Sequence, residues 1–102
     1  MKKVIEGKLY NTDTAKLVES YGYGNPGDLE WMEEGLYLSK KGQFFVAGEG
    51  GPKSKYFKII GQQNWSGGEG CEPISKELAL EWMEAYGTVE MIEIYFKDIE
   101  EA

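Results

Sequence analysis

The chain has 102 residues, of which 41% are hydrophobic and 28% charged, and its formal net charge is −7. A chain of this length folds as one domain with a hydrophobic core, and the acidic excess disfavours nucleic acid as a partner and favours a basic protein. The sequence contains no histidine, which is the usual general base and the commonest metal ligand. It also contains no arginine, whose guanidinium group forms paired hydrogen bonds with phosphate and guanine. We therefore expect a protein that acts by binding, is not an enzyme and needs no cofactor or metal.

The charge is distributed unevenly along the chain. Residues 69–102 hold ten acidic residues against two lysines, an excess of eight negative charges. Residues 1–68 are nearly neutral, with nine lysines against eight acidic residues, and the stretch 40–58 has five lysines with Glu49 as its only acidic residue. The molecule is thus electrically polarised, with its acidic part at the C-terminal end.

Cysteine content and hydropathy indicate a cytoplasmic protein. Cys71 is the single cysteine, so it forms no internal disulfide and no multi-cysteine metal site, and we expect it to be a small, semi-buried core residue. No apolar run approaches the ~18 residues of a membrane span, and residues 1–3 are followed by no signal-type apolar stretch. We expect a soluble, unprocessed protein that does not enter a membrane.

The N-terminal segment predicts a strand followed by a helix. Residues 4–10 read as a short strand, and Asn11, Thr12 and Asp13 are possible N-caps for a brief helix over residues 15–18. Residues 21–27 contain three glycines and a proline, which predict a loop that displays two tyrosines.

The middle of the chain predicts a β-hairpin over residues 29–48. Its strands, 29–39 and 43–48, are joined by Lys40-Lys41-Gly42, where Gly42 supplies the positive φ of a three-residue turn with a bulge. Leucines at 36 and 38 alternate with Tyr37, and apolar residues at 44 and 46 alternate with Phe45. One face therefore enters the core, and the other holds aromatic rings against a flanking element.

Residues 49–70 predict a long glycine-rich loop of the kind that often carries function, in which residues 56–60 form a strand or a helical turn. Residues 48–54 miss the phosphate-loop pattern, because Pro52 and Ala47 stand where that pattern needs glycine. The loop combines basic and aromatic residues, which are the ingredients of single-stranded RNA binding, at Lys53, Lys55, Tyr56, Lys58 and Trp65. The alternative, which we favour, is that the aromatic residues fix the loop to the core.

The C-terminal third predicts two helices. Ser75 caps a helix over residues 76–86 that ends at Gly87, with Leu78, Trp82 and Ala85 on one face. After Thr88, hydrophobic residues recur with 3-4-3 spacing and favour a second helix, although residues 91–96 are also rich in strand formers; these positions are Val89, Ile92, Phe96 and Ile99. The fold class is then α+β, a small antiparallel sheet packed against two or three helices.

Acidic residues form a candidate partner-binding face on these helices. Glu77, Glu81 and Glu84 share one stripe of the first helix, and Glu90 and Glu93 are expected beside it. The alternative is a solvated helix face, but like charges at this spacing cost a few tenths of a kcal/mol each, which a basic partner would relieve. A carboxylate pair such as Glu49 with Glu69 could serve acid–base or metal chemistry, although solvated surface charge is the interpretation that we favour.

Three blocks of sequence together resemble a known family. They are residues 6–18 (EGKLYNTDTAKLV), residues 48–56 (GEGGPKSKY) and residues 64–69 (NWSGGE), the last leading to Pro73-Ile74-Ser75 and a helix that bears Glu-Trp. As a set they resemble small proteins carried by plasmids, phages and conjugative elements of Gram-positive bacteria, some relatives of which are anti-CRISPR inhibitors of type II RNA-guided nucleases. The resemblance spans residues 6–83. The chain departs from the pattern at Gly70-Cys71, where a lysine commonly follows Gly-Gly-Glu, and in its more hydrophobic last segment.

This resemblance implies an anti-CRISPR inhibitor that binds stoichiometrically to a basic RNA-guided nuclease, with or without guide RNA, or to its guide-loading step. It implies the cytoplasm of a bacterial host cell as the location, and it carries over no functional residues. Two alternatives stay open: a small RNA-binding accessory factor using the loop 53–65, and a mobile-element regulatory protein. In each case the protein is a monomer or a homodimer.

Overall fold

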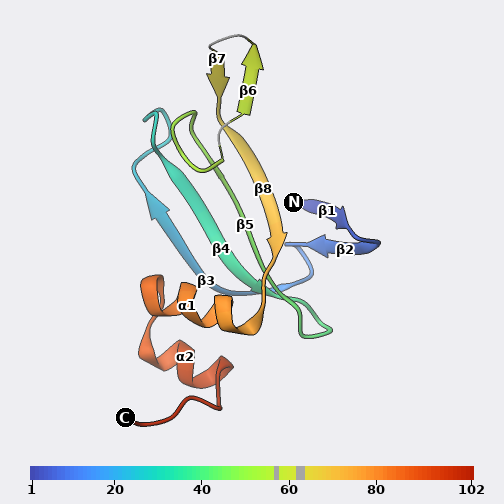
Figure 1. Ribbon diagram of the computed structural model, residues 1–102, viewed down its shortest axis with the longest axis vertical. Coiled ribbons are helices and arrows are strands. Elements are labelled where there is room, and N and C mark those ends of the chain that lie inside the picture. The colour runs from blue at the N-terminus through green and yellow to red at the C-terminus, as the bar shows by residue number, and fades with distance from the viewer. Residues whose placement is uncertain (57, 62–63) are drawn as a thin grey trace.

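The protein is an α+β domain built on one four-stranded antiparallel sheet, as the sequence predicted (Figure 1). The computed structural model describes residues 1–56, 58–61 and 64–102, and it describes 58–61 and 64–66 by their backbone. The sheet has the order β3-β4-β5-β8, and two further pairs, β1-β2 and β6-β7, form separate hairpins. The elements are β1 (Lys2–Ile5), β2 (Lys8–Asn11), β3 (Lys16–Tyr23), β4 (Met32–Leu38), β5 (Phe44–Gly50), β6 (Lys58–Gly61), β7 (Asn64–Ser66), β8 (Gly68–Pro73), α1 (Lys76–Tyr86) and α2 (Val89–Tyr95).

The central hairpin is confirmed. Strands β4 and β5 pair in continuous register from Leu38↔Phe44 to Met32↔Gly50. At the turn, the Ser39 N–H donates to the Gln43 carbonyl and the Gly42 N–H to the Ser39 carbonyl, each at 2.9 Å. Gly42 has φ +89°, which is the left-handed conformation that this three-residue turn requires.

The N-terminal prediction was wrong at three points. The loop predicted over residues 21–27 starts later, because residues 21–23 pair with β4 as the end of β3. Residues 4–10 are a hairpin rather than one strand, because Glu6 and Gly7 both adopt positive φ, at 51° and 78°, and form a two-residue turn. The helix over 15–18 is absent, and that segment opens the long edge strand β3. Asn11 explains the difference: its side chain accepts the Asp13 N–H at 2.9 Å and its carbonyl accepts the Ala15 N–H at 3.0 Å. The polar residues that suggested a helix cap form a tight turn instead.

The two faces of the sheet bury different side chains, as the alternation in the hairpin predicted. The helix-side core contains Leu36, fully buried, and Phe44, whose ring stacks on Phe96 at 5.3 Å between centroids. On the opposite face Phe45 stacks on Tyr37 at 5.3 Å and is covered by the β1-β2 hairpin. This smaller core also includes Cys71, the expected filler, which is 7% exposed.

Both C-terminal helices are confirmed, but only some of the apolar residues that the sequence placed on one face are buried, among them Trp82 and Phe96. The Ser75 hydroxyl accepts the Leu78 N–H at 3.1 Å, and the Thr88 hydroxyl accepts the Met91 N–H at 3.3 Å, so each helix has its side-chain cap. The second helix, favoured over a strand, spans Val89–Tyr95, so the predicted positions Phe96 and Ile99 lie beyond its end.

The way α1 packs on the sheet determines which apolar residues of the helix are buried. Ala79 and Met83 are fully buried beside Trp82, whereas Leu78 is 52% exposed and Ala85 is also exposed. On and after α2, Phe96 enters the core, while Val89 is 69% and Ile99 43% exposed. Apolar residues cover a wide arc of each helix, so periodicity alone could not select the contact side.

The glycine-rich segment contains more strand than predicted. It holds β8, which pairs along β5 from Phe45↔Pro73 to Gly50↔Gly68, as well as the short hairpin β6-β7. Of the stretch 56–60, left open as strand or helical turn, residues 58–60 lie in the strand Lys58–Gly61, Tyr56 lies in a turn, and residue 57 is outside the described residues. Within the described residues, no helix has the length and apolar character needed to cross a membrane.

Candidate binding surfaces

The first candidate is the acidic helical surface, which we define as Glu77, Glu81, Glu84, Glu90 and Glu93. All five side chains are exposed, on the two helices at the C-terminal end of the fold (Figure 1). Among the described residues the ion pairs are Lys76 with Asp98, at 3.1 Å, and Lys55 with Glu34, at 2.6 Å, so none of the five has a cationic partner. The sequence placed these carboxylates on solvated helix positions, and the structure agrees. They are available to an external basic group.

The two lysines of the C-terminal third, Lys76 and Lys97, leave the charge of this surface uncompensated. Lys76, the first residue of α1, binds the carboxylate of Asp98 beyond the end of α2. Neither helix has a basic residue in its last turn. Glu93 and Lys97 are four residues apart, but Lys97 follows the end of α2 and forms no ion pair among the described residues. The Glu–Lys pairs that often stabilise a solvated helix are therefore not formed here.

The sheet carries a second group of carboxylates, which we call the acidic row: Glu33, Glu49 and Glu69. Glu49 on β5 lies directly opposite Glu33 on β4 and Glu69 on β8, and all three are exposed. The sequence suggested Glu49 with Glu69, but it could not suggest Glu33, because only strand register brings the three together. Like charges directly opposite one another destabilise a sheet. No cluster of three or more His, Cys, Asp or Glu residues suited to a metal ion is found in the described part of the chain.

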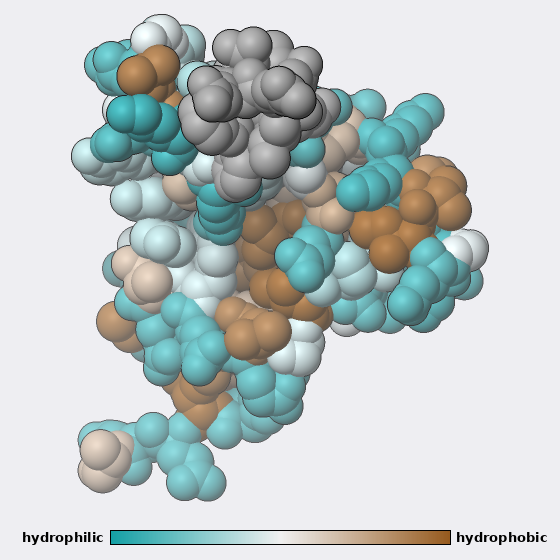
Figure 2. Space-filling view, turned by 45° about the horizontal axis from the view of Figure 1, so that its top comes forward, coloured by the Kyte–Doolittle hydropathy of each residue, from teal (hydrophilic) through white to brown (hydrophobic). Residues whose placement is uncertain are grey.

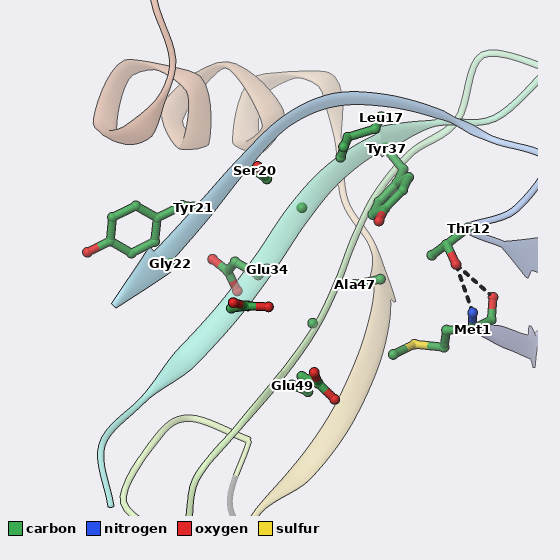
Figure 3. A pocket seen from close by; sticks show the side chains of 13 residues that line it. Met1, Thr12, Leu17, Ser20, Tyr21, Gly22, Glu34, Tyr37, Ala47 and Glu49 are labelled. Atoms are coloured by element: carbon green, nitrogen blue, oxygen red, sulfur yellow. Dashed lines mark hydrogen bonds between the residues drawn. The ribbon is translucent and has the colours of Figure 1, made fainter. Parts of the chain in front are cut away.

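A shallow cavity of about 390 Å³ lies on the same face as the acidic row. Figure 3 shows Leu17 and Tyr37 at one end of it and Glu49 toward the other. Its floor includes Gly35, where an added Cβ would lie 2.8 Å from Leu17 Cδ1 and 2.9 Å from Tyr37 Cε2. Glycine is therefore required at that position for these side chains to pack across the floor.

Glu34 is a buried carboxylate at the centre of a hydrogen-bonded cluster that the sequence did not reveal. It is 3% exposed, its Oε1 accepts the Trp82 indole N–H at 2.9 Å, and its Oε2 accepts the Tyr56 hydroxyl at 2.5 Å and the Lys55 ammonium at 2.6 Å. Burial raises the pKa of Glu34, but the hydrogen bonds from Lys55, Tyr56 and Trp82 and the charge of Lys55 lower it overall. The carboxylate is held ionised and joins the loop at 51–56 and α1 to β4.

The cluster decides what two residues of the predicted RNA-binding loop do. Burial and the Glu34 carboxylate raise the pKa of Tyr56 strongly, so its hydroxyl stays protonated and donates to Glu34. Lys55 pairs with the same carboxylate, while Lys53 is exposed. Lys58 lies on β6 and Trp65 on β7, and both side chains are outside the described residues. The contacts of Lys55 and Tyr56 support the interpretation that this loop is fixed to the core.

Comparison of the chain with protein-family models, with curated proteins and with solved structures finds no match. The function is therefore argued from the surfaces described above together with the resemblance of the three sequence blocks.

Proposed function

We propose that this protein is a stoichiometric inhibitor that binds a basic type II RNA-guided nuclease through the acidic helical surface. The observation that carries the proposal is that all five carboxylates of this surface are exposed and, within the described residues, lack a cationic partner. The class of target comes from the resemblance of residues 6–18, 48–56 and 64–69 to mobile-element proteins, and no catalytic step is proposed.

The physical basis is charge complementarity on a rigid support. A nuclease of this kind holds its RNA–DNA heteroduplex in a positively charged channel. The capped helices fix the backbone positions of these carboxylates, so a basic surface that binds them has to order the side chains but not the backbone. Complementary charge contributes mainly to the association rate and to specificity. With a net charge of −7, the protein would cover part of such a channel, which is compatible with blocking guide loading, DNA binding or cleavage.

The alternative of an RNA-binding accessory factor has less support. It relied on free basic and aromatic side chains in the loop, and two of them, Lys55 and Tyr56, bind Glu34 within the protein. The net charge of −7 also opposes a polyanionic ligand.

The test is a DNA-cleavage assay with several purified type II nucleases, in which the protein is added before or after guide RNA is loaded. We expect inhibition in at least one order of addition, together with a complex that co-elutes on a sizing column. The triple variant E77K/E81K/E84K should lose inhibition at physiological salt. The matched control is D13K/E30K/E33K, which changes the net charge equally at three exposed positions outside the two helices.

Two outcomes would contradict the proposal. The first is the absence of both inhibition and complex formation with every nuclease tested. The second is equal loss of inhibition in the two triple variants, because that would assign the effect to net charge rather than to the acidic helical surface.

A further inference from the structure

Strand β8 is an edge of the four-stranded sheet and has an open side. It pairs only with β5 among the described strands. The Ile74 N–H donates to the Phe44 carbonyl at 3.0 Å, which shows that residue 74 faces β5. Backbone groups alternate in direction along a strand, so Glu72 and Gly70 also face β5, and Glu69 and Cys71 point their N–H and C=O groups away from the sheet.

Pro73 fits this alternation. It lies directly opposite Phe45 at one of the outward positions, so its missing N–H removes no bond to β5. The outward edge therefore has two complete residues, the exposed Glu69 and Cys71, which is 7% exposed and also lines the groove beside this edge. Pro73 ends the ladder. This is the backbone pattern that an added strand pairs with.

The open edge lies in a groove of about 980 Å³. One wall comes from the β1-β2 hairpin, and the other comes from α1 through Leu78 and Trp82. Hydrophobic surface lies in the hollow beside the projecting hairpin (Figure 2). Val4 and Leu78, on opposite walls, are 67% and 52% exposed, so the groove holds apolar side chains that the described residues leave largely uncovered.

Charge selects the kind of segment that fits. The charged side chains that line the groove are Glu6, Glu69 and Glu72 against Lys3 and Lys55, and Lys55 is already paired with Glu34. Glu69 and Glu72 are exposed and lie on opposite faces of β8 itself. A second copy of β8 would bring two more glutamates into the same short stretch, and like charges across a strand pair are destabilising. A segment with lysine or arginine at those places would turn the repulsion into attraction.

We propose that the open edge of β8 binds an extended, basic segment of the partner protein as a fifth strand of the sheet. This rests on the proposed function for the identity of the partner as a basic protein, and it adds a second contact region. The partner's backbone would pair with Glu69 and Cys71, its cationic side chains three residues apart would face Glu69 and Glu72, and its apolar side chains would lie against Val4 and Leu78.

The test uses a synthetic peptide rather than the nuclease, so that its result is separate from that of the cleavage assay. The probe is Thr-Val-Lys-Val-Thr-Lys-Val-Thr, and the control peptide has glutamate in place of both lysines. Amide exchange is measured by NMR on the full chain. The lysine peptide should slow exchange at Glu69 and Cys71, and the glutamate peptide should not. The E77K/E81K/E84K variant should show the same slowing, because its changes lie outside the edge.

Two substitutions at one residue separate backbone pairing from charge. Glu69→Pro removes an outward N–H and no bond to β5, and Glu69→Gln removes the charge and keeps the N–H. We expect Glu69→Pro to bind the peptide at least about fivefold more weakly than Glu69→Gln, with both folds verified by their NMR spectra. Equal affinity of the two variants would overturn the proposal, as would equal binding of the glutamate peptide. If exchange at Glu69 and Cys71 slows as the protein concentration is raised without any peptide, the edge binds a second copy of the chain. That result would also overturn the proposal.

Discussion

The most exacting prediction concerns Glu34, whose buried carboxylate accepts hydrogen bonds from Trp82, Tyr56 and Lys55. Glu34→Gln keeps the size and one acceptor oxygen but removes the charge. Hydrogen bonds to a charged group contribute about 1.5–3 kcal/mol each, and the Lys55 partner must be discounted because its side chain is 55% exposed. We expect Glu34→Gln to lower the free energy of unfolding by about 1–3 kcal/mol at pH 7. Glu34→Ala, which also leaves buried donors unpaired, should cost about 3–5 kcal/mol.

The pH dependence of this effect follows from the lowered pKa of Glu34. The unfolded carboxyl titrates near its ordinary value of about 4.3, and the folded one titrates below it. The ionised carboxylate therefore stabilises the fold fully above the unfolded pKa, and that contribution is lost as pH falls through the folded pKa. Protonated Glu34 resembles glutamine, so the stability difference between wild type and Glu34→Gln should shrink toward zero in acid.

Urea unfolding monitored by tryptophan fluorescence, repeated from pH 7 down to pH 2.5, measures this difference. Glu33→Gln is the matched control, because its carboxylate is exposed and the change should stay within about 0.5 kcal/mol. A Glu34→Gln difference that does not vary with pH would refute the reasoning, since it would arise from packing rather than from charge.

Three further predictions concern the two cores. Phe96→Ala removes a fully buried ring stacked on Phe44 and should lower the unfolding free energy by about 3–5 kcal/mol in urea titrations, while Ile99→Ala, at an exposed neighbouring position, should change it far less. Gly35→Ala places a Cβ within 3 Å of Leu17 and Tyr37 and should cost about 1–3 kcal/mol in the same assay, and a neutral result there would show that these side chains move aside freely. Burial, opposed by the charge of Lys3, raises the pKa of Cys71, so its thiol should react with a disulfide reagent at pH 7 much more slowly in the folded protein than in urea, and equal rates would contradict the buried position.

The two proposed contact regions meet at α1. Leu78 lines the groove beside β8, and in the sequence it stands between Glu77 and Glu81 of the acidic helical surface. One basic partner could therefore place a strand on the sheet edge and a cationic surface on the helices. Combining E77K/E81K/E84K with Glu69→Pro should then weaken a nuclease complex more than either change alone.

Elements with strong local signals were predictable from the sequence. The turn at Gly42 needs a positive φ, and Ser75 and Thr88 cap the two helices, so these elements depend on neighbours within a few residues. The alternation in residues 36–38 and 44–46 likewise predicted two buried faces. The accumulation of carboxylates in the last third of the chain is a property of composition and needs no fold.

The same local signals misled where two structures satisfy them equally. Asn11 can form either a tight turn or a helix cap. The turn forms because residues 16–23 gain hydrogen bonds by pairing with β4. Strand β8, rich in glycine, has little strand propensity of its own and forms because β5 offers it a complete hydrogen-bonding edge.

Charge and helix propensity were therefore determined by the sequence itself, while the candidate contacts were decided by the tertiary structure. The acidic row exists because register sets Glu33, Glu49 and Glu69 opposite one another. The Glu34 cluster joins residues 22 and 48 positions apart, and the open edge of β8 depends on which strand is last in the sheet. Such relations arise from pairing between distant segments, which composition and periodicity do not encode.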